Sequence, residues 1–364
     1  MNGVPEAMTA VHLTGNGGPE MLVVRHDVPV PVPAADEVLV RVRACGMNNT
    51  DINTRVGWYS KAVTGATSGD GFAHVDGDGT WGGDGLAFPR IQGADPCGEV
   101  VATGSAADPS LVGRRVLADG WIRDAEDPSN RDLAGYLGSE RDGGFAQYCA
   151  IPARNVHPLE SSLTDVELAS FPCSWSTALH MLTRARLADG ETVVVTGASG
   201  GVGTALVQLA KLRGARVVAV TSAAKAASVA SLGADAVVDR AADDLAAAVL
   251  EAASGPVDVL ADVVGGGDFA SLLEVLRRGG RYTTAGAIAG PIVDLDLRTL
   301  YLNDLELYGC TVYEPQVFAD LVGHIQRGEV SPVVAATFPL AEIHAAQEAF
   351  AAKSHVGAMV IEVP

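Results

Sequence analysis

The sequence lacks the features that mark several large classes of protein. Its five cysteines are an odd number, lie far apart and form no C-x-x-C pair, which argues against a disulfide framework. No basic and then apolar segment opens the chain, and no apolar stretch reaches the roughly 18 residues that would span a membrane. We therefore expect a reduced, cytoplasmic protein.

Positive charge is also scarce. Lys and Arg number 25 against 44 Asp and Glu, which gives a net charge of -19. Nucleic acids and anionic membranes would repel such a chain, so we expect neither as a partner and look for a small-molecule substrate. With 364 residues, 48% of them hydrophobic and 19% charged, the chain is long enough for two globular domains.

Patterns typical of β-strands dominate the first part of the chain, from about residue 9 to residue 158. We expect a partly open β-barrel there, because short apolar runs are separated by Gly and Pro. The predicted strands are 38–44, 98–102, 114–118 and 143–150. Between Ser60 and Phe88 lies a long segment without periodicity, which fits a lid, a binding loop or a solvated excursion.

From Thr164 onward the chain alternates between helix-like and strand-like segments, which is typical of a parallel sheet. The predicted helices are 166–171, 174–182, 223–232, 243–253 and 269–277. The six predicted strands are 192–195, 216–221, 236–239, 257–264, 281–285 and 305–310. Two amphipathic helices, 315–328 and 340–352, and a closing strand at 358–363 indicate a return to the first domain.

The most informative stretch runs from Thr192 to Thr204, a β-rich apolar run that ends in glycines and passes into a helical pattern. Small residues stand at Ala198, Gly200 and Gly203, with the spacing of a Rossmann dinucleotide fingerprint. Gly200 would let the backbone approach a pyrophosphate, and Gly203 would let the following helix pack closely. We therefore predict a dinucleotide site.

Several motifs, in this order, resemble those of the medium-chain dehydrogenase/reductase superfamily, in particular its zinc-independent quinone oxidoreductase and enoyl reductase branch. They cover nearly the whole chain: Gly46-Met-Asn48 with Asp51, Arg55-x-Gly57-x-Tyr59, Gly143-Gly-Phe-Ala-Gln-Tyr148, Thr196 to Gly203, Leu232-Gly-Ala-Asp235, Asp262-x-Val264-Gly-Gly266 and His355-Val-Gly357.

The resemblance implies an α/β fold with a GroES-like β-barrel catalytic domain and a doubly wound Rossmann domain. We expect the catalytic domain over residues 1–158, completed by 315–364, and the cofactor domain over 159–314. Relatives are often dimers joined through the last Rossmann strand, so we expect a homodimer joined near 305–310.

The end of the second predicted strand of the Rossmann unit favours NADPH over NADH. An NAD site needs an acidic residue about 20 residues after the first small residue of the turn, and none stands there. Instead Ser222 and Lys225 follow the strand, and in the resembling family such residues hold a 2′-phosphate. Arg240 adds a further cation. The alternative is a helix-capping Ser222 with solvated Lys225 and Arg240.

The remaining predicted cofactor residues surround the turn or follow later strands, where ligands sit in doubly wound sheets. Thr177 resembles a family threonine near the cofactor, although it could instead cap a helix. The others are Ser199, Gly201, Val202, Val264, Gly265, Gly286 and Ala287.

We expect no metal. Where zinc-dependent members of the resembling superfamily carry a ligand Cys this chain has Asn48, and where they carry Gly-His-Glu it has Gly93-Ala94-Asp95. The lobe that binds a structural zinc through four Cys is absent too. Cys45 and Cys97 lie near those motifs and fit small buried thiols better than ligands.

Without zinc, hydrogen-bond donors must stabilise the charge that develops on the substrate oxygen. Asn48 has an amide donor at the cleft, and Tyr59 matches a family tyrosine there. A turn role for Asn48 and core packing for Tyr59 are the alternatives. His74 in the long segment could donate a proton, but a solvated histidine is the more ordinary role.

These observations predict an NADPH-dependent reductase of an activated C=C bond in a quinone, an enone or an enoyl thioester. The alternatives are a zinc-independent carbonyl or alcohol oxidoreductase, a biosynthetic enzyme with an unusual pocket, and a non-catalytic NADPH-binding protein.

Overall fold

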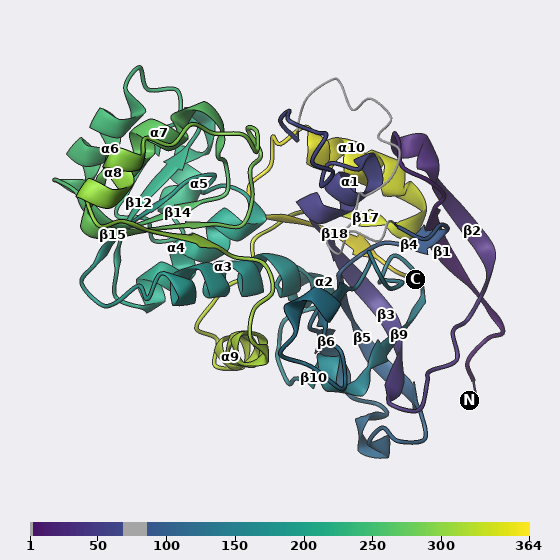
Figure 1. The fold of residues 1–364 in the computed structure, drawn as a ribbon. Helices are drawn as coiled ribbons and strands as arrows, with labels where there is room; N and C mark the ends of the chain where they lie inside the picture. The colour runs from purple at the N-terminus through teal and green to yellow at the C-terminus, as the bar shows by residue number, and fades with distance from the viewer. Residues whose placement is uncertain (1–2, 68–85) are drawn as a thin grey trace.

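Two lobes make up the structure, a computed structural model that describes residues 3–67 and 86–364 (Figure 1). The first lobe, on the right of the figure, contains both chain ends, and the second lobe lies on the left. The candidate proton donor His74, in the long segment between Ser60 and Phe88, lies outside the described residues. Within the described ranges no helix is long and apolar enough to cross a membrane.

The first lobe is organised around a seven-stranded sheet whose members come from both ends of the chain. Strand β3 pairs antiparallel with β5, β9 and β18, so the last strand of the chain lies beside an early one. The strands of this sheet are β3 (Glu37–Met47), β5 (Asp95–Thr103), β6 (Arg115–Ala118), β9 (Tyr148–Pro152), β10 (Val156–Pro158), β17 (Val334–Pro339) and β18 (Ala358–Glu362).

Two smaller sheets and two helices enclose the core of this lobe, in which Leu39, Phe145 and Ile361 are fully buried. The strands are β1 (Ala7–Leu13), β2 (Leu22–Pro29), β4 (Arg90–Ile91), β7 (Trp121–Ile122) and β8 (Gly135–Tyr136), and the helices are α1 (Asn49–Val56) and α10 (Ile343–Ala351). The predicted barrel-like first lobe is confirmed.

The second lobe contains a six-stranded sheet in which every neighbouring pair is parallel. Its order is β13 (Ala236–Asp239), β12 (Arg216–Thr221), β11 (Thr192–Val195), β14 (Val257–Asp262), β15 (Leu276–Thr284) and β16 (Glu306–Gly309). The chain starts in the middle and winds outward in both directions, which confirms the predicted doubly wound α/β fold.

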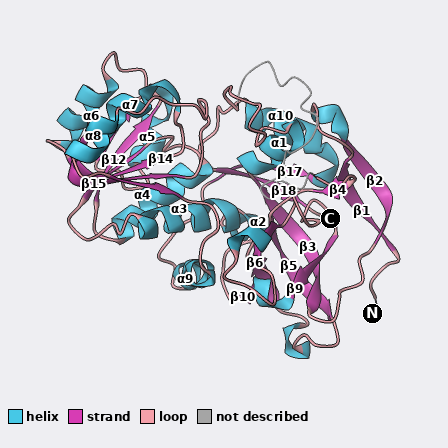
Figure 2. Ribbon diagram, viewed as in Figure 1, coloured by secondary structure: helices cyan, strands magenta, loops and turns pink. Residues whose placement is uncertain are grey.

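Helices cover both faces of the parallel sheet, as Figure 2 shows. Helices α3 (Pro172–Arg184), α4 (Gly201–Leu212) and α9 (Pro315–Gln326) contribute to the core on one face. Helices α6 (Leu245–Ala253) and α7 (Phe269–Leu273) contribute to the core on the other face. The remaining helices are α2 (Asp165–Ala169), α5 (Ala226–Ala230) and α8 (Leu297–Leu302). The first of these cores also includes Leu117 and Trp121 of the first lobe, so the lobes share apolar packing.

Three predicted boundaries were wrong. The helix expected over 269–277 ends at Leu273, and β15 starts at Leu276 and continues through Gly279 and Gly280. Gly279 and Gly280 form an irregularity within this strand, with Gly279 at φ +71°. The strand expected over 143–150 begins only at Tyr148. Strand β17 was not predicted, because its alternate residues are exposed and its sequence is only weakly apolar.

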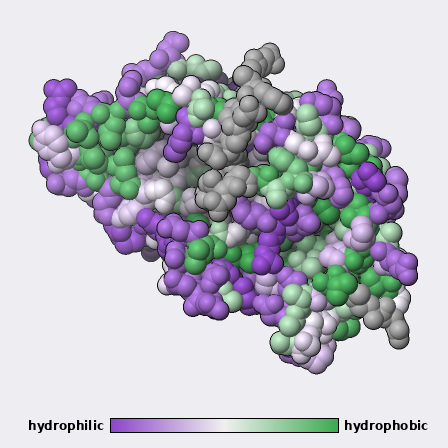
Figure 3. Space-filling model, turned by 45° about the vertical axis from the view of Figure 1, so that its right-hand side comes forward, coloured by the Kyte–Doolittle hydropathy of each residue, from purple (hydrophilic) through white to green (hydrophobic). Residues whose placement is uncertain are grey.

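Strand β16 lies at the edge of the parallel sheet. Large apolar side chains are exposed on β16 and just before it, namely Ile292, Leu297, Tyr301, Leu302 and Leu307. Figure 3 shows hydrophobic residues gathered on the second lobe. The homodimer expected through this strand stays a prediction.

Candidate functional site

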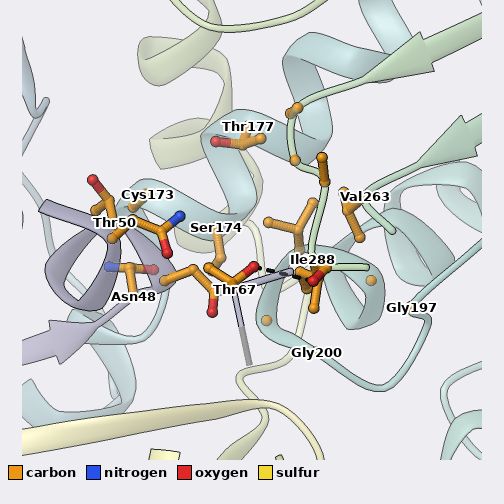
Figure 4. Close-up of a pocket in the computed structure, with 18 of the residues that line it drawn as sticks. Asn48, Thr50, Thr67, Cys173, Ser174, Thr177, Gly197, Gly200, Val263 and Ile288 are labelled. Carbon is orange, nitrogen blue, oxygen red and sulfur yellow. Dashed lines mark hydrogen bonds between the residues drawn. The ribbon is translucent and has the colours of Figure 1, made fainter. Parts of the chain in front are cut away.

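A cavity of about 450 Å³ lies between the two lobes. Residues of α1 and the segment after it line one side, and the turn after β11 and the loop after β15 line the other. Thr67 spans the two sides, since its backbone N–H and its hydroxyl both donate to the carbonyl oxygen of Ile288 (Figure 4). The predicted residues in this lining are Asn48, Tyr59, Thr177, Gly200, Gly201, Val202, Gly203, Gly286 and Ala287.

The glycine turn, residues 197–203, joins β11 to α4 along one wall of the cavity. Gly197 has φ +58°, and a Cβ on Gly203 would lie 2.2 Å from the carbonyl oxygen of Gly197. Ala198 is fully buried beneath the turn. No side chain caps α4 at Gly200, so its first amides remain available to an anion.

The tail segment, residues 353–357, crosses the glycine turn just before β18. The N–H of Gly357 donates to the carbonyl oxygen of Ser199 at 2.9 Å, and Gly357 also forms a bridge with Gly200. Gly357 has φ +90°, and a Cβ there would lie 2.2 Å from the carbonyl oxygen of Val333. The end of the chain therefore holds the outer side of the turn.

Four basic residues form a cluster beside the turn: Lys225, Arg240, Lys353 and His355. The Nζ of Lys225 donates to the carbonyl oxygen of Lys353 at 2.6 Å, and the Nζ of Lys353 lies 3.8 Å from the Phe350 ring centroid. The ring of His355 lies 5.4 Å from the same ring, and its buried Nδ1 has no hydrogen-bond partner. Burial and mutual repulsion lower the pKa values of Lys225, Lys353 and His355.

This cluster is unusual in so acidic a chain, because within the described ranges none of its four members forms an ion pair with a carboxylate. Ser222 lies at the start of the turn that carries Lys225, and its side chain makes no capping hydrogen bond. The structure thus brings Ser222, Lys225 and Arg240 to one place, as expected. Sequence reasoning missed Lys353 and His355, which come from the tail.

Asn48 and Tyr59 approach the cavity from the first lobe. Asn48 is the N-cap of α1, and its backbone N–H donates to the Asp51 carboxyl group at 2.7 Å. Tyr59 is half-buried beside Trp58, with ring centroids 5.7 Å apart. Burial raises the pKa of Tyr59, although hydrogen bonds with Thr50 and Asn53 act in the opposite direction.

Two carboxyl groups are buried beneath Asn48. Burial raises the pKa of Asp51 to about 7. It raises the pKa of Asp95 well above its ordinary value, while hydrogen bonds from Asn48 and Cys173 oppose that rise. Both groups therefore carry less negative charge near neutral pH than exposed aspartates do.

Thr177 lies in the cavity lining, but the alternative role considered for it, a helix cap, is wrong. It lies inside α3, which begins at Pro172. Cys173 lies four residues before Thr177 on the same helix face and lines the cavity together with Ser174. This four-residue spacing from Thr177 could have predicted from the sequence that Cys173 lines the cavity.

Val264 and Gly265 do not line the cavity but form the turn after β14 behind it. The carboxyl group of Asp262 accepts hydrogen bonds from the N–H groups of both residues and from the hydroxyl of Tyr282. Asp262 therefore fixes this turn, where Gly265 adopts φ +61°.

The residues at the positions where zinc-dependent members of the superfamily carry their ligands do not fit a metal. Asn48 offers an amide and Ala94 a methyl group, neither of which is a usual zinc ligand. In the part of the chain that the structure describes, no three His, Cys, Asp or Glu side chains come together as a metal site.

Comparisons with known proteins agree with this architecture. A family described as the alcohol dehydrogenase GroES-like domain matches residues 34–161, and one described as zinc-binding dehydrogenase matches residues 201–327. The acryloyl-coenzyme A reductase of Metallosphaera sedula is 28% identical over 92% of this chain and 95% of its own length. The quinone oxidoreductase of Mus musculus is 28% identical over 94% of this chain and 93% of its own length.

The chain belongs to the medium-chain dehydrogenase/reductase superfamily. Within the superfamily it falls in the quinone oxidoreductase and enoyl reductase branch.

Solved structures of this superfamily superpose closely. A protein of Sinorhizobium meliloti 1021, provisionally named an alcohol dehydrogenase, is 50% identical with a TM-score of 0.91, over 100% of this chain and 99% of its own. The 2-octenoyl-CoA carboxylase reductase CinF of a Streptomyces species was solved in complex with NADP and 2-octenoyl-CoA. It is 26% identical with a TM-score of 0.84, and the match covers 99% of this chain and 88% of its own. This member of the superfamily is therefore an oxidoreductase that binds a nicotinamide dinucleotide.

Replacing Gly203 by Ala tests the glycine turn. The added Cβ would meet backbone atoms of Gly197 and Ala198, which cannot move aside cheaply, so we expect a cost of about 1–3 kcal/mol and at least tenfold weaker NADPH and NADH binding. Thermal unfolding and fluorescence titration measure the two effects. Gly267→Ala in the same lobe is the control, since open space surrounds Gly267. Equal cofactor affinity in the two variants would contradict the assignment.

Proposed function

We propose that this protein uses NADPH to reduce a C=C bond conjugated to a carbonyl group, as in a quinone, an enone or an enoyl thioester. The observation that carries the cofactor choice is the basic cluster beside the glycine turn. The substrate class draws its support from relatives named as acryloyl-coenzyme A reductase, quinone oxidoreductase and 2-octenoyl-CoA carboxylase reductase.

The basic cluster suits the phosphates of NADPH. Cations without carboxylate partners repel one another, and a phosphate dianion would relieve that repulsion. The carbonyl oxygen of Lys353 now accepts the hydrogen bond of Lys225 that a phosphate oxygen would take. We assign the 2′-phosphate to Ser222, Lys225 and Arg240, and the pyrophosphate to the amides at the start of α4, from Gly201 to Gly203, since the N–H of Gly200 already donates to the carbonyl oxygen of Gly197.

Tyr59 is suited to deliver the proton. A raised pKa keeps its phenol protonated, and the neutral phenol is the form that donates. When bound, NADPH would supply the hydride to the carbon of the double bond remote from the carbonyl group. The amide nitrogen of Asn48 already donates to Asp95, so Asn48 presents its oxygen to the cavity as an acceptor and is not the donor expected from the sequence. The apolar lining from Trp58, Val263 and Ile288 limits access of water.

We further propose that the reaction needs no zinc, because Ala94 has no atom that coordinates a metal. The second candidate is reduction of a simple carbonyl group or oxidation of an alcohol, which the alcohol dehydrogenases among the similar structures favour. A non-catalytic NADPH-binding protein is the third.

A substrate panel separates these functions. With NADPH as the cofactor we expect turnover of a quinone, an enone or an enoyl-CoA, and none of simple ketones or, with NADP, simple alcohols. Tyr59→Phe should lower the turnover number by about 10²-fold or more while NADPH affinity stays unchanged, because only the proton donor is lost. Turnover of simple alcohols alone would reject the proposal, and tight NADPH binding without any turnover would favour the third candidate.

Lys225→Met tests the cofactor choice. Loss of one charged hydrogen-bond donor should weaken NADPH binding by about 10- to 100-fold and leave NADH binding within about twofold. Lys61→Met is the matched control, since Lys61 is an exposed lysine of the other lobe. Equal affinities of the unaltered protein for NADPH and NADH would count against NADPH preference.

The pH dependence of cofactor binding tests whether Lys353 also faces a phosphate. Burial and the charge of Lys225 lower the pKa of Lys353 to about 8 in the free protein. A bound phosphate favours the charged amine and raises that pKa, so NADPH affinity should be constant below about pH 7 and fall as pH rises through 8. The fall should disappear in Lys353→Met. A fall of the same size in that variant would exclude Lys353 as its cause.

A further inference from the structure

We propose that Asp95 is a positioning residue of the site, whose buried carboxyl group sets the orientation of the Asn48 side chain and ties it to the start of α3. This inference goes beyond the proposed function and relies on it only where catalysis is measured.

Asp95 connects two segments that both line the cavity, the start of α1 and the start of α3. It is the first residue of β5 and is 2% exposed. Its Oδ2 accepts a hydrogen bond from Nδ2 of Asn48 at 2.9 Å, and its Oδ1 accepts one from the backbone N–H of Cys173 at 3.0 Å. Each carboxyl oxygen thus has one donor, and the donors come from separate helix starts.

The second of these hydrogen bonds replaces a helix cap. Helix α3 begins at Pro172, and Phe171 occupies the capping position before it. The side chain of Phe171 makes no capping hydrogen bond. Asp95 reaches across from the first lobe and accepts from the second residue of the helix. An acidic group at this end also interacts favourably with the helix dipole. Cys173, Ser174 and Thr177, which line the cavity, are thereby held relative to β5.

The start of α1 is also fixed by a capping box, in which the side chain of Asn48 faces the backbone N–H of Asp51 and the side chain of Asp51 accepts from the backbone N–H of Asn48. Asp95 is the partner of the Asn48 nitrogen. The N–H of Asn48 donates to Asp51, and the side chain of Gln92 donates to the carbonyl oxygen of Asp51. Gly46 leaves room for the Asp95 carboxyl group, since a Cβ at Gly46 would lie 2.9 Å from Oδ2 of Asp95 and 2.3 Å from a backbone carbonyl oxygen.

The Asp95 contact therefore decides which end of the Asn48 amide is turned inward. In its ionised form, which the hydrogen bonds from Asn48 and Cys173 favour, the Asp95 carboxylate can only accept, so it selects the Asn48 nitrogen, which can donate, over the oxygen, which cannot. In Figure 4 the amide nitrogen of Asn48 points away from Thr67 and Ile288, and its oxygen points toward them. Asp95 thus determines how many hydrogen-bond donors and acceptors Asn48 presents to a substrate.

Asp95→Asn replaces one accepting carboxyl oxygen by a donating amide nitrogen and leaves the shape of the side chain unchanged. The backbone N–H of Cys173 cannot turn round, so the new amide must keep its oxygen there and present its nitrogen to Asn48. Two nitrogen donors would then face each other. Asn48 must turn its amide over or lose the contact, and in either case its own nitrogen is released from the buried hydrogen bond.

Hydrogen exchange of the Asn48 side chain tests this without any substrate. Selective ¹⁵N-asparagine labelling gives side-chain amide signals, and the pair lost in Asn48→Ala belongs to Asn48. We expect these hydrogens to exchange slowly in the unaltered protein and at least about tenfold faster in Asp95→Asn. The buried amide of Asn155, which donates to the carbonyl oxygens of Asp119 and Trp121, serves as the internal control.

A double-mutant cycle tests whether Asp95 acts through Asn48. We expect Asp95→Asn to lower kcat/KM about tenfold in the unaltered protein but less than about twofold in the Asn48→Ala background, with NADPH affinity unchanged throughout. A residue that merely supports the fold would give the same factor in both backgrounds.

Three results would overturn the proposal: fast exchange of the Asn48 amide in the unaltered protein, exchange unaffected by Asp95→Asn, or equal losses of kcat/KM in both backgrounds. The first is decisive even if Asp95→Asn fails to fold. If the unaltered protein reduces none of the panel substrates, the proposed function has failed, and hydrogen exchange still decides the role of Asp95.

Discussion

The close approach of α4 to the glycine turn is the constraint on which the rest of the site depends. Gly203 lies so near the backbone of Gly197 and Ala198 that a single Cβ would not fit, and this contact brings the first amides of α4 to the cavity wall. The tail segment then binds the outer side of the same turn through Gly357. The wall of the cavity that the second lobe provides is therefore supported by a segment that returns to the first lobe.

Hydrogen bonds between polar side chains and backbone groups also organise the first-lobe side of the cavity. Asn48 and Asp95 join the start of α1 to the start of α3 by hydrogen bonds. Thr67 adds a contact from the first lobe to Ile288 of the second. The cavity is bounded by directional contacts between the lobes as well as by their shared apolar core.

The sequence predicted the parallel sheet, the glycine turn and most of the cavity lining, because periodicity and glycine spacing are local properties of the chain. It did not reveal the basic cluster in full, since Lys353 and His355 lie more than a hundred residues from Lys225 and the motif His355-Val-Gly357 does not by itself indicate a contact with the cofactor. The partners of Asn48 were hidden for the same reason. Boundaries such as the start of β15 were wrong because a glycine pair can interrupt a strand as well as end a helix.

The position of β18 has a consequence for the order in which the protein forms during synthesis. This strand lies between β3 and β17, yet it follows every strand of the second lobe in the sequence. The parallel sheet of the second lobe is continuous in sequence and can assemble while the tail is still being made. The first lobe must wait with residues 44–47 of β3 unpaired on one side, a short open strand edge that invites association with other nascent chains until β18 has been made.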